Sequence, residues 1–500
     1  MSHVLVIGAG IGGLTTAARL AKAGHVVEVF ESAHYVGGKC RTEWIGDFAY
    51  DTGPTLLTLP AVYRDFFAST GAPIEEILEL VPVDPSFDYR FVNGDSIEFA
   101  NLSRLRTLQS ISNNFGVSSA NEWSELMLRS QAMWDASRQP FIESELVSFR
   151  SLAKTPSLLK NLRTIAPWQS LRSLVTNTSK DSRLQFIVDR YATYSGSDPR
   201  KAPAVLLSIA YVEEAFGAWH IKGGVGQLAS AIRDRALELG VKIHLETPVD
   251  SIIHDQHKVL GLRLKNKNLI KGDLVVANAD ASLVYTSLLS KDVRVLRKAR
   301  KAISKAEPSL SGFSIFLGLR KDANSPKMQH HTILFPENYD AEFDAIFTKR
   351  CPVPDPAIYI CAPNDPLMSR DSDLEGWSIL VNAPPHSKNP ARGWDWQDPE
   401  FARFYAEKII DTIESRGFPI RNRMLSLQLR TPADIERELG APGGSIYGTS
   451  SNGARSAFLR AKNRSPLLGL YCVGGSAHPG GGLPLVGISA DIVSRAIGKA

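Results

Sequence analysis

The sequence has few cysteines, no long apolar run and little excess charge of either sign. Its four cysteines, Cys40, Cys351, Cys361 and Cys472, are too few for a disulfide framework in a chain of 500 residues. Cys351 and Cys361 lack the spacing of metal ligands, so we expect no metal site, and free thiols fit a reducing cytoplasm. The net charge of +5 is too small to imply a nucleic-acid partner.

No run of about 18 apolar residues occurs, so we expect no helix that spans a bilayer. The first residues show neither a charged n-region nor a cleavage site, so we expect no targeting segment. Peripheral attachment to a membrane stays open. The composition, 43% apolar and 22% charged, is ordinary for a globular protein, and the length suggests roughly three domains.

A βαβ unit is predicted at the beginning of the sequence. Residues 4–7 form a short apolar, β-branched run, which favours a buried strand. A glycine cluster at 8–13 precedes an amphipathic helix that ends at Gly24. Residues 25–30 predict the second strand.

Similar elements return later, with other material between them. Residues 106–215 are predicted to be mostly helical, and the prolines of 352–366 favour a loop bordered by strands. An amphipathic helix is predicted within 222–240. Further strands are predicted at 241–245, 259–264, 273–280 and 470–473, the last before a glycine cluster and a final helix. This order predicts one discontinuous domain that contains inserted segments.

The glycine cluster matches the G-x-G-x-x-G pattern of dinucleotide sites. Gly8 permits a tight turn, Gly10 lets the backbone approach a pyrophosphate, and Gly13 lets the helix pack closely on the strand. The helix N-terminus then presents unpaired N–H groups to the phosphates. Glu31 follows the second strand, where a carboxylate accepts hydrogen bonds from ribose hydroxyls.

Two glycines and two cations directly after this acid favour FAD over a plain nicotinamide cofactor. Gly37 and Gly38 let a bulky cofactor lie on the backbone. Either Lys39 or Arg41 could neutralise a pyrophosphate.

The run from Gly8 to Arg41 resembles the superfamily of FAD-dependent amine oxidases and carotenoid desaturases, and further segments resemble bacterial phytoene desaturases. These segments are 50–55 (YDTGPT), 278–280 (NAD) and 471–484 (YCVGGSAHPGGGLP). Because they occur in the family's order from start to end, the likeness covers the full length of the chain.

The resemblance implies an FAD site built from distant segments. Val249 would meet the adenine, Asn278 and Ala279 the pyrophosphate, and Gly474 and Gly475 the second phosphate and the ribitol. The last helix would direct its positive end at the flavin. The full set of expected cofactor-binding residues is Gly8, Gly10, Ile11, Gly12, Gly13, Glu31, Ser32, Gly38, Lys39, Arg41, Gly53, Pro54, Thr55, Leu56, Val249, Asn278, Ala279, Gly474, Gly475, Leu483, Pro484 and Val486.

The resemblance also implies an α/β (α+β overall) fold of three parts. The expected parts are a discontinuous Rossmann-like FAD-binding domain (1–80, 215–304 and 441–500), an inserted substrate-binding β-sheet domain (81–105 and 305–440) and a helical subdomain (106–214).

The implied reaction is desaturation of a phytoene-like polyene, by hydride transfer to flavin and loss of a neighbouring proton. His478 is the candidate base, although a structural role beside Pro479 is an alternative. Electrons would pass to a quinone or to oxygen. Because a long hydrocarbon does not diffuse freely through water, we expect the protein to lie peripherally on the inner face of the cell membrane.

Two basic segments bear on this expectation. Residues 146–180 carry Arg150, Lys154, Lys160, Arg163, Arg172 and Lys180 without an acid, interleaved with leucines and Trp168. They predict either membrane-binding helices or a core-packed helix with a solvated basic face. The run 291–305 predicts a solvated helix face.

Other functions stay open at this stage. Within flavin chemistry they are an amine oxidase, a hydroxycarotenoid desaturase and a carotene isomerase. Outside enzymes, the alternative is a lipid-binding escort protein on the same fold.

Overall fold

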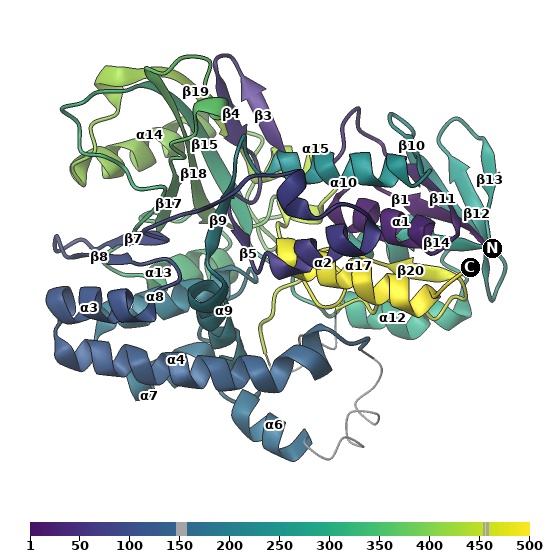
Figure 1. Cartoon of the computed structure of the whole chain (residues 1–500), viewed down its shortest axis with the longest axis horizontal. Helices are drawn as coiled ribbons and strands as arrows, with labels where there is room; N and C mark the ends of the chain where they lie inside the picture. Colours follow the sequence, from purple (N-terminus) through teal and green to yellow (C-terminus); the bar gives the residue numbers. More distant parts are fainter. Residues whose placement is uncertain (147–157, 454–455, 457–459) are drawn as a thin grey trace.

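The computed structural model describes residues 1–146, 158–453, 456 and 460–500 (Figure 1). Its centre is a parallel five-stranded sheet whose strands come from the start, the middle and the end of the chain. In spatial order they are β10 (Lys242–His244), β2 (Val26–Phe30), β1 (His3–Ile7), β14 (Leu274–Ala277) and β20 (Leu470–Cys472). The predicted βαβ unit and the later strands are confirmed.

Strand β1 is buried on both faces, as in other parallel sheets covered on two sides. Val4 and Val6 belong to one core, whereas Leu5 and Ile7 belong to another. Four helices supply the first core: α1 (Ile11–Lys22), α2 (Ala61–Thr70), α10 (Gly226–Glu238) and α17 (Leu483–Ile497). On the other side lie the antiparallel strands β11 (Val249–His254), β12 (Val259–Leu264) and β13 (Leu269–Lys271), with α11 (Ala281–Leu283) and α12 (Arg297–Ile303).

A second, seven-stranded sheet is mainly antiparallel and stands apart from the first in Figure 1. Its order is β19 (Met424–Arg430), β15 (Ser311–Arg320), β18 (Leu374–Ala383), β17 (Ile358–Cys361), β16 (His331–Leu334), β7 (Phe87–Arg90) and β8 (Ser96–Phe99). Helix α14 (Pro399–Ser415) packs on it through Tyr405 and Ile409, and α15 (Pro432–Leu439) follows β19. The predicted loop bordered by strands at 352–366 is confirmed only in part. Residues 358–361, between the prolines, form β17, which pairs with β16 and β18.

A helical layer covers the strands β7 and β8, which confirms the prediction for 106–215 (Figure 1). Trp123 and Leu126 pack there against Phe87 and Tyr89 in one core. The helices are α3 (Arg104–Phe115), α4 (Val117–Ser137), α6 (Leu158–Ile165), α7 (Leu171–Thr178), α8 (Ser182–Thr193) and α9 (Ser208–Phe216), and the short α13 (Asp340–Phe343) lies beside them.

Short strands join these layers. The hairpin β3 (Thr42–Ile45) and β4 (Phe48–Asp51) packs on the seven-stranded sheet, where Phe48 and Tyr50 meet Phe316. Strand β9 (Ala218–Ile221) pairs with β5 (Leu57–Thr58) and β6 (Leu80–Pro82).

The two basic segments differ in how far their cations are exposed to solvent. In 146–180 the core-packed alternative holds for α7, because Leu171 and Leu174 are buried and Arg172 forms ion pairs of 2.7 Å with Asp189 and Asp340. Trp168, however, is 70% exposed, and Arg163 is exposed beside it. Two further cations of this segment, Arg150 and Lys154, lie outside the described residues.

The run 291–305 confirms the predicted solvated face. Arg297, Lys298 and Lys301 of α12 are exposed. Arg300 is the exception, since its guanidinium donates to the carbonyl oxygen of Tyr285 at 2.8 Å. Across the ranges that the structure describes, no helix combines the length and apolar character needed to cross a bilayer.

Candidate FAD-binding site

The predicted glycine turn joins β1 to α1 at the edge of the parallel sheet. Gly8 has a φ of +91°, in the left-handed region that favours glycine. A methyl group on Gly13 would lie 2.1 Å from the carbonyl oxygen of Gly8, so only glycine lets the helix approach this closely. At the start of α1, the N-cap Gly10 offers no side-chain hydrogen bond and no acidic residue occupies the first turn. The N–H groups at the start of α1 are therefore available as hydrogen-bond donors to an anion.

Asn278, which follows β14, brings glycines from both ends of the chain together. Methyl groups on Gly10 and Gly12 would each lie 2.7 Å from the Asn278 amide group, and one on Gly474 would lie 2.6 Å from it. Gly12 also faces Val486 of α17, at 3.2 Å by the same measure. These glycines are therefore required by the packing of the Asn278 side chain against the N-terminus of α1. This junction, called the groove below, is where we expect the pyrophosphate.

Glu31 lies beside this turn, at the end of β2. Its carboxylate accepts from the N–H of Ala9 at 2.7 Å and from the N–H of Ala33 at 2.9 Å, and the exposed Ser32 donates to it at 3.2 Å. The N–H of Thr247 donates to the Glu31 carbonyl at 2.7 Å. Because Val249 begins β11 just beyond, the expected adenine contact and the ribose acid lie on neighbouring segments.

The segment after Glu31 returns to the glycine turn. The N–H of Gly37 donates to the carbonyl of Ala9 at 2.8 Å, and a methyl on Gly38 would lie 3.4 Å from the Cα of Gly10. Gly53 is equally constrained, since a methyl there would lie 1.8 Å from the Lys39 carbonyl oxygen. The expected residues Gly38 and Gly53 are thus held against the same groove.

The two predicted cations take different positions. Lys39 donates from Nζ to the carbonyl oxygens of Ser445 at 2.8 Å and Ile446 at 3.0 Å, and burial lowers its pKa to about 8. Arg41 instead pairs with Glu43 at 2.5 Å and lies over the ring of Tyr35. Among the described residues no carboxylate lies within ion-pair distance of Lys39, so of the two cations Lys39 is the better placed to neutralise a phosphate charge.

The last helix begins as expected next to the glycines of the C-terminal motif. Pro484 lies in the first turn of α17, where proline is tolerated because that N–H has no intrahelical partner. The Leu483 carbonyl accepts from Tyr63 at 2.6 Å, which fixes the start of α17 against α2.

The chain continues from Gly53 toward the seven-stranded sheet through Pro54, Thr55 and Leu56. Thr55 Oγ1 is hydrogen-bonded with the Tyr359 hydroxyl at 2.5 Å, and Leu56 packs on the core beneath the helical layer. Ala279 packs on the opposite side of the parallel sheet, in the core beside β11.

His478 is enclosed. Its Nε2 donates to the carbonyl of Ser144 at 3.0 Å, and burial lowers its pKa to about 4, so the ring is neutral. Its own carbonyl accepts from Asn463 and Ser489, each at 2.8 Å. These contacts fit a structural role for His478 better than a role as the base in the reaction.

Several buried polar residues escaped the sequence analysis. Arg460 donates to the carbonyls of Gly475 at 2.8 Å and Thr449 at 2.7 Å, and burial lowers its pKa to about 10. Arg190 bonds the hydroxyls of Tyr89 and Tyr194. Arg460 and Arg190 lie in segments without a motif, so no local pattern in the sequence predicts these contacts.

Comparisons with known proteins agree with this geometry. Residues 11–343 match the model of the family described as flavin containing amine oxidoreductase. The chain is 31% identical over 498 residues to hydroxyneurosporene desaturase of Rubrivivax gelatinosus, covering 99% of this chain and 93% of the relative. It is 29% identical to the zeta-carotene-forming phytoene desaturase of Myxococcus xanthus (99% and 93%) and to 4,4'-diapolycopene oxygenase of Methylomonas sp (98% and 97%).

Solved structures show the same fold. An oxidoreductase from Methanosarcina mazei aligns with a TM-score of 0.64 at 19% identity, covering 99% of this chain and 100% of the other. A redesigned putrescine oxidase aligns with a TM-score of 0.66 at 14% identity, covering 99% and 98%.

The chain therefore belongs to the flavin-containing amine oxidoreductase family, and its resemblance to the carotenoid desaturases is confirmed by relatives that match over its whole length. The protein is an FAD-dependent oxidoreductase with the predicted α/β fold. The individual contacts to FAD and the role of His478 stay predictions.

Replacing Glu31 with alanine should weaken FAD binding by about 10- to 100-fold, because the ribose loses a charged hydrogen-bond acceptor. Glu76→Ala, at an exposed position, serves as the matched control and should retain FAD like the parent. Flavin absorbance after extensive dialysis measures both. A Glu31→Ala protein that stays fully loaded would contradict the assignment.

FAD affinity should fall as the pH rises above about 8. Burial lowers the pKa of Lys39 to about 8, whereas a bound pyrophosphate favours its charged form, so binding takes up a proton above that pH. The loss should reach at most about tenfold per pH unit. Titrations of apoprotein with FAD from pH 7 to about 10 measure it.

Lys39→Arg keeps its charge at these pH values and should flatten the curve. Lys298→Arg, on the exposed face of α12, should leave the parent curve unchanged. Superimposable curves for the parent and Lys39→Arg would remove Lys39 from the cofactor site.

Proposed function

We propose that this protein desaturates a carotenoid, with a phytoene-like polyene as substrate. A hydride would leave a saturated carbon beside the conjugated chain and a proton would leave the neighbouring carbon, which forms the new double bond. The main support is the match over almost the whole chain, at about 30% identity, to enzymes named for desaturating carotenoids.

FAD, when bound, supplies the hydride acceptor for this reaction. The groove formed by Gly10, Gly12, Asn278 and Gly474 would hold its pyrophosphate, and Glu31 its ribose. The N-terminus of α17 would place its positive end where negative charge develops during hydride transfer. Conjugation in the substrate would spread the positive charge, so no strong nucleophile is needed.

A second candidate reaction is oxygenation of a related apocarotenoid. The observation that favours it is the similarity to 4,4'-diapolycopene oxygenase, at 29% identity over 495 residues. Desaturation of a hydroxylated carotenoid has equal support from the Rubrivivax relative. An amine oxidase has weaker support, because putrescine oxidase shares the fold at only 14% identity.

Pigment analysis separates these candidates. We expect cells that accumulate phytoene, or else a hydroxylated carotenoid, to gain longer conjugated chromophores when they express the protein. Glu76→Ala should match the parent, and Glu31→Ala should convert less. Chromatography with mass spectrometry measures the products: loss of hydrogen pairs marks desaturation, and added oxygen marks the second candidate. A purified flavoprotein that reduces its flavin with amines, and leaves every carotenoid unchanged, would overturn the proposal.

We further propose that the protein collects this substrate at the inner face of the cell membrane. At about 0.8 kcal/mol per apolar carbon, transfer of a forty-carbon chain from lipid to water costs roughly 30 kcal/mol. Electrons taken from the substrate would pass to a quinone or to oxygen.

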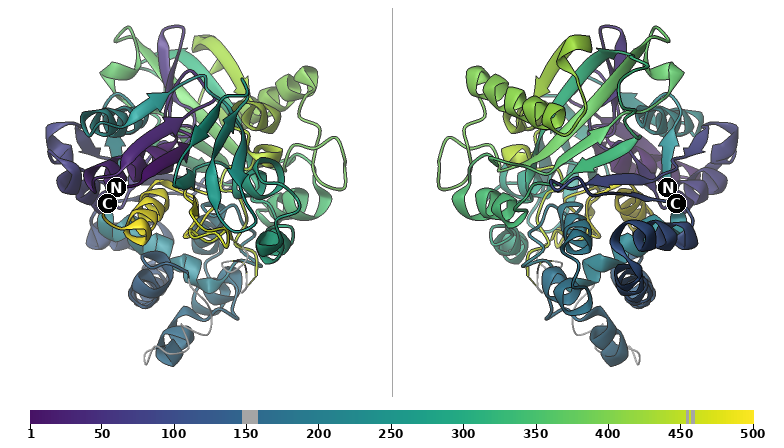
Figure 2. Two further views of the ribbon diagram at one scale, coloured as in Figure 1. Left: turned by 90° about the vertical axis from the view of Figure 1, so that its right-hand side faces the viewer. Right: turned by 90° about the vertical axis from the view of Figure 1, so that its left-hand side faces the viewer.

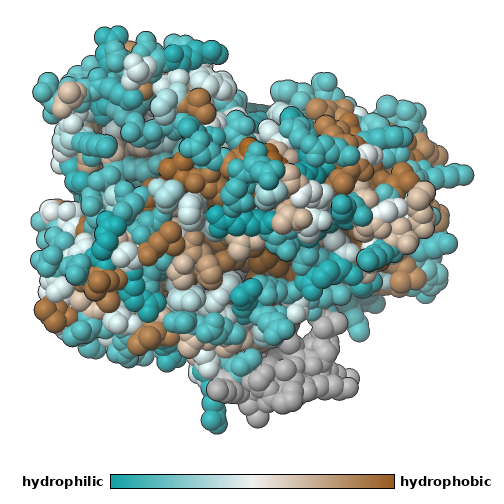
Figure 3. All heavy atoms as spheres, viewed as in Figure 1, coloured by the Kyte–Doolittle hydropathy of each residue, from teal (hydrophilic) through white to brown (hydrophobic). Residues whose placement is uncertain are grey.

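Helix α6 and the turn after it are the candidate membrane contact. Helix α6 projects from the helical layer in Figures 1 and 2. It carries the exposed Arg163, and Trp168 follows it at 70% exposure. Tryptophan and basic side chains both favour the interface of anionic lipid. Elsewhere, on the face shown in Figure 3, hydrophilic side chains predominate and hydrophobic ones form small groups.

Arg163→Glu with Trp168→Ala should reduce binding to anionic liposomes by roughly tenfold, since about 1 kcal/mol per basic residue is lost together with the aromatic contact. Lys298→Glu with Trp44→Ala changes an exposed cation and an exposed tryptophan elsewhere and should bind like the parent. Flotation assays measure both. Arg172 is unsuitable for such a test because its ion pairs are internal. Equal binding by both double variants would remove α6 from the proposal.

A further inference from the structure

Two histidines and a cysteine meet inside the seven-stranded sheet. His331 begins β16 and His330 directly precedes it, and Cys361 ends the neighbouring β17, where it is the register partner of His331. One ligand atom from each of the three side chains lies within 4.8 Å of the others. His331 is fully buried, Cys361 is 2% exposed and His330 is half-buried, so water has little access to two of the three side chains.

Both imidazoles have a buried nitrogen without a partner. Among the described residues, no hydrogen bond reaches Nε2 of His330 or Nε2 of His331. Buried polar atoms are nearly always paired, and a bound ion is one cause of such exceptions. Because the rest of the described structure offers these two nitrogens no partner, a ligand from outside the chain could use them.

A chain of hydroxyl groups orients the inner ring. Nδ1 of His331 is hydrogen-bonded with the Tyr359 hydroxyl at 2.8 Å, and that hydroxyl with Thr55 at 2.5 Å. Metal-binding histidines are held by just this kind of partner on the second nitrogen, which fixes the tautomer and the ring orientation.

We propose that His330, His331 and Cys361 form a binding site for a thiolate- and imidazole-binding metal ion, with Zn²⁺ as the best match. Two imidazole nitrogens and one sulfur are a zinc-type donor set, and three protein ligands leave a fourth position open. Binding would remove the thiol proton of Cys361 to solvent, so one proton is released for each metal ion bound.

The charges around the cluster are compatible with a cation. Arg190 lies near the cluster, and its positive charge opposes a bound cation. Glu213 offsets part of that charge, because the Tyr194 hydroxyl is hydrogen-bonded with both side chains. On the other side, His220 donates to Asp365 at 2.8 Å, and the His220 ring lies 4.9 Å from that of His330. Asp365 and the Cys361 thiolate would supply the compensating negative charge.

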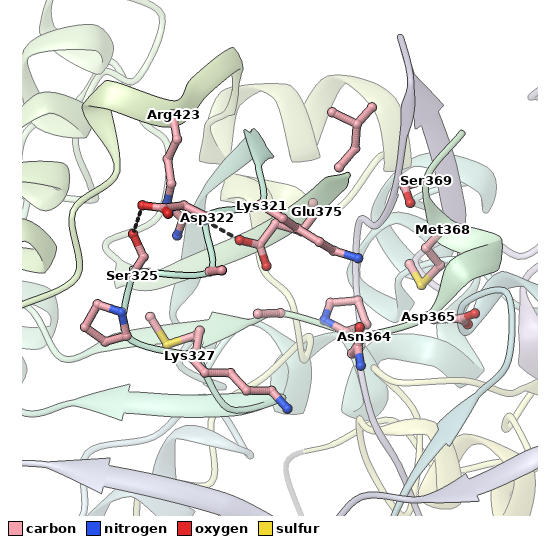
Figure 4. A pocket seen from close by; sticks show the side chains of 17 residues that line it. Lys321, Asp322, Ser325, Lys327, Asn364, Asp365, Met368, Ser369, Glu375 and Arg423 are labelled. Atoms are coloured by element: carbon pink, nitrogen blue, oxygen red, sulfur yellow. Dashed lines mark hydrogen bonds and ion pairs between the residues drawn. The ribbon is translucent and has the colours of Figure 1, made fainter. Parts of the chain in front are cut away.

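A surface cavity of about 430 Å³ comes close to the cluster without being lined by any of its three residues. Asp365, Met368 and Ala362, the residue after Cys361, are among its lining residues. Figure 4 shows Asp365 and Met368 on one side of this cavity, opposite Glu375 and Arg423. The carboxylate of Asp365 thus lies between solvent and His220, next to the cluster.

This site does not depend on the proposed carotenoid reaction, and its test uses no turnover. Purified holoprotein is treated with a chelator, equilibrated with Zn²⁺, passed through gel filtration and assayed for zinc by mass spectrometry. We expect about one zinc per chain. Cys361→Ser and His331→Gln should each weaken binding by at least about 100-fold, and Tyr359→Phe by about tenfold, the lower limit for an outer-shell partner.

Cys351→Ser and His25→Gln change a cysteine and a histidine outside the cluster and should bind zinc like the parent. Flavin content and circular dichroism identify variants that fail to fold. X-ray absorption measures the distances from zinc to its ligands in the parent protein, so it tests the site without any substitution. We expect one sulfur at about 2.3 Å and nitrogens at about 2.0–2.1 Å. A parent without retained zinc, a shell of oxygen ligands only, or a folded Cys361→Ser that binds like the parent would each overturn the site.

Discussion

The close packing of glycines around the Asn278 side chain is the constraint on which the structure depends. The ends of β1 and β14, the start of α1 and the turn after β20 converge there, and side chains larger than hydrogen at Gly10, Gly12, Gly13 or Gly474 would meet atoms at less than 3 Å. The N-terminus of α1, its positive end, therefore lies at this junction without a covering side chain of its own. Helix N-termini of this kind bind phosphates through unpaired N–H groups.

This junction explains how the inserted segments are arranged. The parallel sheet draws its strands from residues near 5, 28, 243, 275 and 471, so the chain leaves the sheet and returns to it repeatedly. The two longest excursions build the helical layer and the seven-stranded sheet. Both therefore begin and end at the parallel sheet.

Buried polar contacts join the segments that connect the two sheets. Lys39 donates to the carbonyls of Ser445 and Ile446, and Thr55 is hydrogen-bonded with Tyr359 of the seven-stranded sheet. Buried polar groups of this kind fix a unique arrangement only when they are satisfied. Lys39 and Thr55 meet this condition, whereas His330 and His331 retain unpaired nitrogens, which is why the metal site is inferred there and not at the cofactor groove.

The sequence by itself determined the parallel sheet, the glycine turn, Glu31 and the C-terminal cofactor motif, because each depends on local patterns: β-branched runs, glycine spacing and a proline at a helix start. It also identified the family and FAD. It did not reveal β17 between the prolines, the internal ion pairs of Arg172, or the histidine–cysteine cluster. Those features join residues far apart or on neighbouring strands, and pairing between strands carries no local signal. Cys361 lacks metal spacing along the chain and gains its histidine neighbours only through the register of β16 and β17.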